Sequence, residues 1–350
     1  MVPALWAGWQ LPATARVGRQ GGDTLMAEVR MSRTTQGAGG KVRLSHRRKW
    51  LWIALSVAGL ALLGAGALIG TAAYLAETLA RVERVMPGET PASLGVAYES
   101  VRFPSRGDPL ALDGWFIPAV VDAPAVVLVH GEKYHRADPT LKMLELAADL
   151  HAAGYNVLMF DLRGHGGSEG RFFSAGYYER RDVLGAVDYL GTRGFPPHRI
   201  VLLGFSLGAS TVLMAAGEEP GLAALVIDSA FADINSMMHR EAARRNRAAR
   251  YLVPLLVWFT RLRYGYDIRD VKPLEAVATV QTPSLFIYGS EDRPAMVEDS
   301  QGLFSASGAS AKELWGGSDA GHAKGYRTAP QEYVARVVSF MRRNVTSGLR

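Results

Sequence analysis

The sequence predicts an α/β domain, with a mostly parallel central sheet flanked by helices, behind an N-terminal transmembrane helix. Two observations support this fold class. The first is a run of 27 residues without a formal charge at 50–76. The second is a series of short Val/Ile/Leu runs that alternate with longer amphipathic stretches further along the chain. Such alternation favours parallel strands joined by helical crossovers.

The composition is that of a folded protein without cysteine chemistry. Of 350 residues, 48% are hydrophobic and 21% are charged, which is enough apolar material for a core. The absence of cysteine excludes disulfide scaffolds, Cys-ligated zinc, iron–sulfur clusters and thiol nucleophiles. No His/Asp cluster has metal-ligand spacing, so we expect no metal and no cofactor.

The net charge of +6 is concentrated at the N-terminus. Residues 1–50 hold nine Lys and Arg against two acidic residues, which gives +7. The remaining 300 residues hold 30 cations and 31 acids, which gives −1. A nucleic-acid-binding fold needs its basic face on the folded part, so we expect no nucleic-acid partner.

The uncharged run at 50–76 is long enough to cross roughly 30 Å of hydrocarbon, so we expect a bilayer-spanning helix there. Residues 31–50 hold six cations, whereas 77–96 hold two, which predicts a cytoplasmic N-terminus and a main domain on the outer side. Cleavage as a signal peptide, at the small residues 67–73, is the competing reading. The apolar run is about twice the usual length of a signal core, so an uncleaved anchor is preferred.

This span divides the chain into predicted parts. Residues 1–49 form a basic, disordered tail and 77–93 a linker. Residues 94–345 form the α/β domain. Within the domain, 96–118 has the pattern of a hairpin. We expect strands at 125–129, 156–160, 199–204, 224–227, 284–288 and 313–315, and helices at 139–153, 177–190, 207–216, 297–305 and 330–343.

The most specific local motif is Gly204-Phe205-Ser206-Leu207-Gly208, between an apolar strand and a helix rich in small residues. A G-x-S-x-G turn between strand and helix is tight, and its glycines leave room where chain segments crowd. Such a turn presents the serine hydroxyl at the carboxyl end of the sheet. Ser206 is therefore the candidate nucleophile.

A serine nucleophile needs a base, and in this architecture the chain order is Ser, acid, His. Only His239 and His322 follow Ser206. His239 lies in an Arg-rich helix, where a solvated position is expected. His322 lies in a small-residue loop between the last strand and the last helix, so it is the candidate base.

The acid that orients the base is expected after the strand at 284–288. Asp292 is the preferred residue, in the segment Gly289-Ser290-Glu291-Asp292. Glu291 and Asp299 are the alternatives. A carboxylate at a strand end also serves as a turn former or helix cap, so position alone does not decide among them.

An oxyanion hole needs two backbone N–H groups directed at the developing charge. The N–H of Leu207, after the nucleophile, is one candidate. The other is the N–H of Glu132, with Lys133 as the alternative, in the loop after the strand at 125–129. His130, in the same loop, is expected to brace the loop and not to act as a base.

Together these segments resemble the α/β-hydrolase superfamily. The matching pieces are VVLVHG, FDLRGHGGSEG, LGFSLGAS, IYGSEDRPAMV and DAGHAKGY. The second is similar to the family's D-x-R-G-H-G-x-S segment, which shapes the floor of the site. The stretch YESVRFPSRGDPLALDGWFIPA looks like the opening hairpin of the branch with membrane-anchored bacterial hydrolases, acyl-protein thioesterase relatives and prolyl-oligopeptidase-type peptidases.

The resemblance covers roughly 94–345 and implies an α/β-hydrolase fold and serine-hydrolase activity, but it does not select a substrate. Two departures are visible. Glu132 is charged where many members have a small or apolar residue, although only its backbone is needed. No second glycine follows His130-Gly131, which argues against a conventional lipase.

The segment 233–278 occupies the usual position of a lid. It contains five arginines followed by the apolar run YLVPLLVWFT. One hypothesis is a lid that rests on the bilayer. The alternative is a packed helix with a solvated basic face.

The function hypothesis is a membrane-anchored serine hydrolase that cleaves a small-molecule carboxylic ester or thioester through an acyl-enzyme. A lipid-like acyl substrate is one option. A serine peptidase or amidase acting on short peptides is the alternative, separable by comparing acyl esters with aminoacyl amides. A catalytically silent membrane-bound scaffold is the alternative from another class. A failed reaction of the wild-type protein with an active-site serine probe would favour it.

Overall fold

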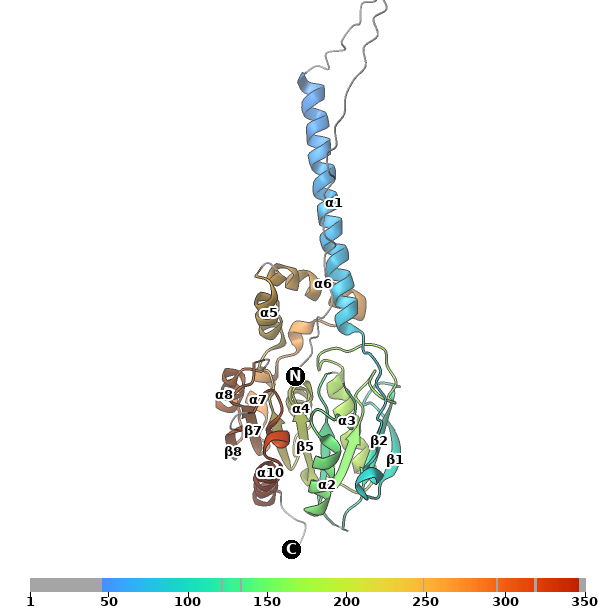
Figure 1. Cartoon of the computed structure of the whole chain (residues 1–350), viewed down its shortest axis with the longest axis vertical. Coiled ribbons are helices and arrows are strands. Elements are labelled where there is room, and N and C mark those ends of the chain that lie inside the picture. The colour runs from blue at the N-terminus through green and yellow to red at the C-terminus, as the bar shows by residue number, and fades with distance from the viewer. Residues whose placement is uncertain are drawn as a thin grey trace, which may run out of the picture. The chain divides into compact units, whose positions relative to one another are not determined.

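The computed structural model describes residues 46–345 except 121, 133, 248, 294, 318 and 319 (Figure 1). The chain divides into two compact units, Met1–Val57 and Ala58–Arg350. The described part of the first unit is the beginning of helix α1, and the second unit contains the rest of α1 and the α/β domain. The predicted tail lies outside the described residues except for 46–49, which are helical.

Helix α1 extends over His46–Ala80 and includes the whole predicted span. Its most apolar 18-residue window has a mean hydropathy of 2.2, and no residue of this window is buried. Among the described residues this is the one helix long and apolar enough to cross a membrane. Its length exceeds the prediction by four residues at each end.

The central layer is an eight-stranded sheet with the order β1-β2-β4-β3-β5-β6-β7-β8. Strand β2 pairs antiparallel with β1 and β4, and the remaining pairs are parallel. This confirms the predicted mostly parallel sheet. The strands are β1 (Glu99–Pro104), β2 (Ala111–Ile117), β3 (Ala125–Val129), β4 (Asn156–Phe160), β5 (Ile200–Phe205), β6 (Ala224–Asp228), β7 (Ser284–Gly289) and β8 (Lys312–Gly317).

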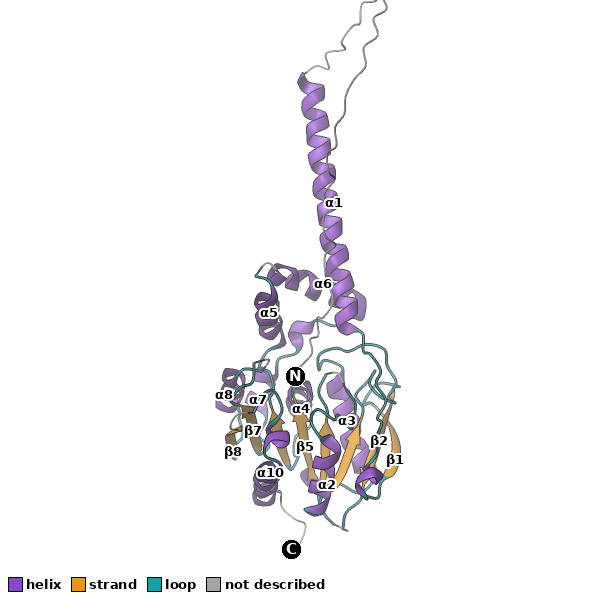
Figure 2. Ribbon diagram, viewed as in Figure 1, coloured by secondary structure: helices purple, strands orange, loops and turns teal. Residues whose placement is uncertain are grey.

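Helices cover both faces of this sheet (Figure 2). In chain order after α1 they are α2 (Met143–Ala152), α3 (Glu179–Thr192), α4 (Leu207–Glu218), α5 (Ile234–Arg245), α6 (Val253–Tyr264), α7 (Pro273–Thr279), α8 (Val297–Ala306), α9 (Gly325–Thr328) and α10 (Pro330–Asn344). Short 3-10 turns lie at Pro91–Leu94, Pro197–Arg199, Ala249–Leu252 and Ile268–Asp270.

Helix α2 begins four residues later than predicted. Lys142 has a positive φ of 54°, which separates the helix from the preceding turn. In that turn, the Asp138 side chain accepts hydrogen bonds from the backbone N–H groups of Thr140 and Leu141. The prediction was wrong here because residues 139–142 form a turn, and the helix begins only after the left-handed Lys142.

The core consists of two apolar layers, one on each side of the sheet. Alternate residues of β3 divide between them: Val127 and Val129 belong to the layer with α3 and α4, whereas Val126 and Leu128 belong to the layer with α2 and α10. All five residues of β3 are completely buried. This two-sided burial explains why inner parallel strands such as β3 and β5 are uninterrupted apolar runs and were located within two residues.

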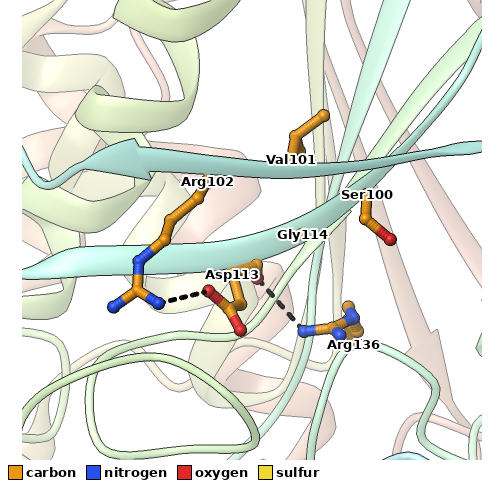
Figure 3. A pocket seen from close by; sticks show the side chains of 6 residues that line it. All are labelled: Ser100, Val101, Arg102, Asp113, Gly114 and Arg136. Atoms are coloured by element: carbon orange, nitrogen blue, oxygen red, sulfur yellow. Dashed lines mark hydrogen bonds and ion pairs between the residues drawn. The ribbon is translucent and has the colours of Figure 1, made fainter.

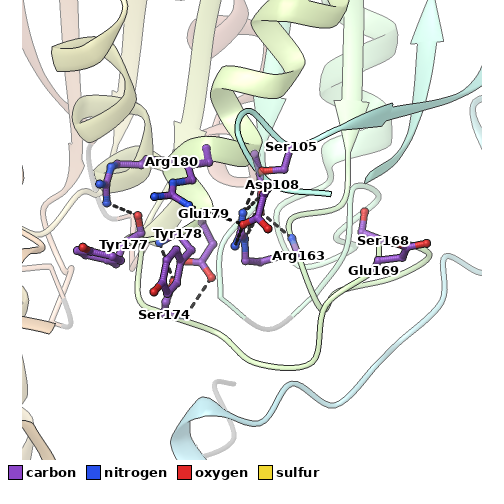
Figure 4. A network of polar contacts seen from close by, with 12 residues as sticks. Ser105, Asp108, Arg163, Ser168, Glu169, Ser174, Tyr177, Tyr178, Glu179 and Arg180 are labelled. Atoms are coloured by element: carbon purple, nitrogen blue, oxygen red, sulfur yellow. Dashed lines mark hydrogen bonds and ion pairs between the residues drawn. The ribbon is translucent and has the colours of Figure 1, made fainter. Parts of the chain in front are cut away.

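The loop after β4, residues 161–178, is held by buried charges (Figure 4). The Arg163 guanidinium donates to Asp182 on α3 at 2.7 Å, to Asp108 at 3.0 Å and to Ser105 at 2.9 Å. The side chains of Arg163 and Asp182 are 4% and 0% exposed. Because removing one partner of such a pair leaves an uncompensated buried charge, this network fixes the loop against the sheet.

The start of the domain differs from the predicted linker at 77–93. Helix α1 continues to Ala80, whose carbonyl accepts from the N–H of Phe173 at 2.8 Å. Arg81 then forms a single antiparallel bridge with Phe172. The first part of the predicted linker is therefore packed on the 161–178 loop.

Candidate active site

Ser206 occupies a sharp turn between β5 and α4, with φ 54° and ψ −117°. A positive φ is unfavourable for a residue with a side chain, and the surrounding structure must hold it. The N–H of Ser206 donates to the carbonyl of Asp228 at 2.8 Å, which ties the turn to the neighbouring strand β6. The hydroxyl is thereby placed at the carboxyl end of the sheet.

The two glycines of the motif make this turn sterically possible. A Cβ at Gly204 would lie 2.5 Å from the Gly208 carbonyl oxygen and 2.6 Å from the Ala209 nitrogen. A Cβ at Gly208 would collide with the carbonyl oxygens of Val129 and His130. These are backbone atoms that have no way to rotate aside, so each position requires glycine.

The structure brings Ser206, His322 and Asp292 together. The Ser206 hydroxyl donates to Nε2 of His322 at 2.6 Å. Nδ1 of His322 lies 2.9 Å from both carboxylate oxygens of Asp292. A carboxylate accepts only, so the proton of a neutral imidazole is on Nδ1, and Nε2 is free to accept the serine proton. The Asp292 side chain is fully buried, and that of His322 is 24% exposed.

The loop with His322 is held against the ends of β6 and β7. A Cβ at Gly289 would lie 2.7 Å from the carbonyl oxygen of Gly321 and would also collide with that of Ala320, so glycine allows the loop to pass close to β7. Ala323, with a φ of 52°, donates its N–H to the hydroxyl of Ser229 at 3.0 Å. Backbone contacts on both sides therefore place the imidazole.

The alternative residues do not lie in this chain of hydrogen bonds. Asp299 accepts from Arg240 of α5 at 2.6 Å and from the N–H of Met296, so it caps α8 and joins it to α5. Glu291 is exposed, next to Asp292. His239 lies on the Arg-rich helix α5, as predicted, but it is half-buried and not solvated.

The loop of Glu132 lies beside the Ser206 turn. A Cβ at Gly131 would be 3.6 Å from the Cβ of Ser206, which is ordinary contact distance. Leu207 begins α4, where backbone N–H groups have no partner within the helix. The start of α4 and the loop before Glu132 are therefore both next to Ser206, and the role of the two N–H groups stays a prediction. Lys133, the alternative donor, is outside the described residues.

Two histidines support the Glu132 loop. His130 is buried; its Nδ1 donates to the Gly131 carbonyl at 2.6 Å, and its Nε2 accepts from the N–H of Leu162 at 3.0 Å. Burial, together with nearby His165, holds the pKa of His130 well below its usual range, so this imidazole is neutral. Nε2 of His165 donates to the Glu132 carbonyl at 2.7 Å. The 161–178 loop therefore sets the position of Glu132.

A second carboxylate, Asp228, lies behind the hydrogen-bonded triad. It is 1% exposed and accepts from the hydroxyls of Tyr333 and Ser229, both at 3.0 Å. Burial raises the pKa of Asp228 to about 7. Sequence reasoning missed this residue because it ended the strand at Ile227. The sequence feature that could have identified it is an aspartate directly after the apolar run ALVI.

A surface depression of about 220 Å³ lies away from the triad (Figure 3). Arg136, one of its lining residues, donates to Asp161 and lies 4.2 Å above the ring of Trp115. Its charge is thus neutralised inside the protein. Within the described part of the chain, no group of three or more His, Asp or Glu side chains forms a metal-ligand set.

Comparison with known proteins agrees with this fold. The model of the Alpha/beta hydrolase family matches residues 126–337, and the chain belongs to that family. YqkD of Bacillus subtilis, an uncharacterized protein, is 30% identical over 219 residues, which cover 62% of this chain and 70% of YqkD. YfhR of Salmonella typhi, also uncharacterized, is 31% identical over 236 residues, with the same coverage.

Solved structures show the same fold. The esterase Pf2001 of Pyrococcus furiosus is 26% identical with a TM-score of 0.64, over 76% of this chain and all of that chain. Est1E of Butyrivibrio proteoclasticus, with ferulic acid bound, has a TM-score of 0.55 over 70% of this chain and 99% of its own. At 17% identity, Est1E shows the fold alone.

The raised pKa of Asp228 predicts a pH-dependent stability. Its folded-state pKa of about 7 is above the ordinary 3.8, so the folded state keeps a proton that the unfolded chain releases. The contribution of this bound proton to the free energy of unfolding is complete below about pH 4 and is lost as the pH rises through 7. We expect Asp228→Asn to reduce this loss, measured as the free energy of unfolding in urea at about pH 5 and about pH 8.

The matched control is Glu298→Gln, an exposed carboxylate at the start of α8. This variant should keep the pH dependence of the wild type. Equal pH dependence of Asp228→Asn and wild type would contradict a protonated Asp228.

Proposed function

We propose that this protein is a serine hydrolase that cleaves a carboxylic ester or thioester through an acyl-enzyme. The observation that carries the proposal is the continuous hydrogen-bonded series from Ser206 through His322 to the buried Asp292. Three residues 30 to 116 positions apart in the chain form it. Their order and contacts are those of a nucleophile, a base and an orienting acid.

Acylation begins when the Ser206 oxygen attacks the substrate carbonyl while Nε2 of His322 accepts its proton. Asp292, ionised and hydrogen-bonded to Nδ1–H, orients the ring and stabilises the imidazolium. The N–H groups of Leu207 and Glu132 donate to the oxyanion of the tetrahedral intermediate. His322 then gives its proton to the leaving alcohol or thiol, and the acyl group remains on Ser206.

Deacylation repeats these roles with water as the nucleophile. His322 takes a proton from the water, the oxyanion forms between the same N–H donors, and collapse of the intermediate returns the proton to Ser206. Every step uses groups within this chain. An ester substrate is supported by the likeness to the esterase Pf2001, the more similar of the two solved structures described above.

We also propose that α1 anchors the enzyme, with the N-terminus in the cytoplasm and the catalytic domain on the outer side of the membrane. The length and hydropathy of α1 support the anchor. The excess of cations before the span, six in residues 31–50 against two in 77–96, supports the orientation.

The role of Ser206 is tested with a fluorophosphonate probe, which reacts with activated serines. We expect Ser206→Ala to lose labelling completely, because the attacking oxygen is gone. The variant Ser305→Ala, an exposed serine on α8, should be labelled like wild type. His322→Ala should lower ester turnover by at least on the order of 10³-fold, whereas His239→Ala should retain it. Undiminished labelling of Ser206→Ala would remove this serine as the nucleophile.

The orientation is tested with a single cysteine, because the chain has none. Val120 is 70% exposed in the catalytic domain. In intact spheroplasts we expect Val120→Cys to react with a membrane-impermeant maleimide, and a cysteine placed at Arg33 in the tail to react only after lysis. The reverse pattern would contradict the proposed orientation.

A further inference from the structure

The last turns of α1 are packed on the domain. Three alanines at intervals of four residues, Ala72, Ala76 and Ala80, are 1%, 2% and 4% exposed. The apolar residues before them are open; Leu60 and Leu63, for example, are 69% and 73% exposed. The change from exposed to buried occurs where the candidate span ends. The anchor therefore meets the domain directly at its own C-terminal end, without a free linker.

The end of α1 and the residues just after it contact the 161–178 loop. The carbonyl of Ala80, the last residue of α1, accepts from the N–H of Phe173 at 2.8 Å. The Arg84 guanidinium donates to the carbonyl of Gly166 at 3.2 Å and to that of Gly170 at 2.7 Å. Val82 lies close to Gly164, where a Cβ would be 3.3 Å from its side chain. Since buried charges around Arg163 hold this loop (Figure 4), the end of α1 is attached to a rigid part of the domain.

This loop is also part of the candidate active site. His165, between Gly164 and Gly166, donates to the carbonyl of Glu132, whose N–H is a proposed oxyanion donor. The loop follows β4, and Ser206 follows β5, so both lie at the edge where the parallel strands end. The anchor thus joins the domain at the catalytic edge of the sheet.

Helix α6 lies beside the same end of α1 (Figure 1). Glu77 is the first residue after the uncharged span. Its carboxylate accepts from the Tyr264 hydroxyl at 2.6 Å. The buried side of α6 includes Val253, Leu256 and Val257. Its outer side is apolar too: Trp258 and Leu262 are 53% and 68% exposed, and Tyr251, just before the helix, is 69% exposed.

We call Tyr251, in the 3-10 turn before α6, together with Trp258 and Leu262 of α6 the outer stripe. Large apolar side chains that lie together on a surface often mark a contact site, and the domain covers only the other side of α6. Three exposed cations, Arg250, Arg261 and Arg263, flank the stripe. Aromatic and aliphatic side chains with adjacent arginines are suited to a surface of anionic lipid headgroups.

From this continuity between the anchor and the outer stripe we propose that the catalytic edge of the domain rests on the bilayer, with α6 in the headgroup region. We further propose that the substrate is an acyl ester or thioester held in that bilayer, which reaches Ser206 from the lipid side. This inference rests on the proposed serine hydrolase and on its anchor, and it specifies the substrate class. The depression in Figure 3, with Arg102 and Asp113 on β1 and β2, has no such continuity with the span.

The docking is tested on the full chain in vesicles of phosphatidylcholine and phosphatidylglycerol. Single cysteines replace Leu262 in the outer stripe, Leu60 in the span, and Val120 between β2 and β3, at the opposite edge of the sheet. Each carries an environment-sensitive fluorophore, and some lipids carry a nitroxide near the headgroup or in the acyl chain. We expect a blue shift and roughly two-fold quenching at Leu262→Cys by the headgroup-proximal nitroxide, and none at Val120→Cys.

The three positions distinguish failure of the docking from failure of the anchor. Quenching at Leu60→Cys but not at Leu262→Cys would keep the anchor and overturn the docking. If the fluorophore at Leu60→Cys were not quenched either, both the anchor and the docking would be contradicted. Equal quenching at Leu262→Cys and Val120→Cys would show non-specific adsorption and would also overturn the proposal.

The substrate class is tested with the double variant Trp258→Ser/Leu262→Ser. We expect the ratio of turnover of a long-chain ester in the bilayer to turnover of p-nitrophenyl acetate in solution to fall on the order of ten-fold. The double variant Leu94→Ser/Val120→Ser, which changes two exposed apolar residues outside the stripe in the same way, should keep the wild-type ratio. An unchanged ratio in the first variant would overturn the substrate class. A wild type inactive on both esters would contradict the proposed function itself, and the fluorescence would still decide the docking.

Discussion

The site depends on one tight turn, in which Ser206 has a positive φ at the end of β5. The turn exists because Gly204 and Gly208 leave space for backbone atoms that any side chain would meet. It is held by the hydrogen bond from the Ser206 N–H to strand β6. Once the hydroxyl is placed, the remaining groups of the site approach from loops at the same edge of the sheet. Apolar layers on both faces of the sheet hold those strand ends in place.

Local patterns in the sequence predict most of this arrangement. Strands such as β3 are buried on both faces, so their apolar runs are short and continuous, and Ser206, Asp292 and His322 each follow a strand end. Contacts between distant side chains are less accessible to this reasoning. Nothing in the local pattern relates His165 to Glu132, or Tyr333 to Asp228, because these pairs depend on how separate loops and helices pack. The late start of α2 has a local cause, the left-handed Lys142, which few sequence patterns reveal.

Helix α1 and the candidate site are connected through one loop. The 161–178 loop contacts the end of α1 through the N–H of Phe173, which donates to the Ala80 carbonyl, and it contacts the Glu132 carbonyl through His165. A buried network around Arg163 gives this loop the rigidity that both contacts need. The positive charge of the chain is concentrated in residues 1–50, and the remaining 300 residues are nearly neutral. In the proposed arrangement, the 161–178 loop joins the membrane helix to the end of the sheet that carries Ser206.

The central claim is that Ser206 carries the acyl group during turnover. The most direct measurement is mass spectrometry of the wild-type enzyme quenched with acid during hydrolysis of a slowly turned-over acyl ester. The account predicts the added mass of one acyl group on the peptide that contains Ser206, and its disappearance when the substrate is exhausted. Turnover without an acylated Ser206, or with the acyl group on another residue, would contradict it.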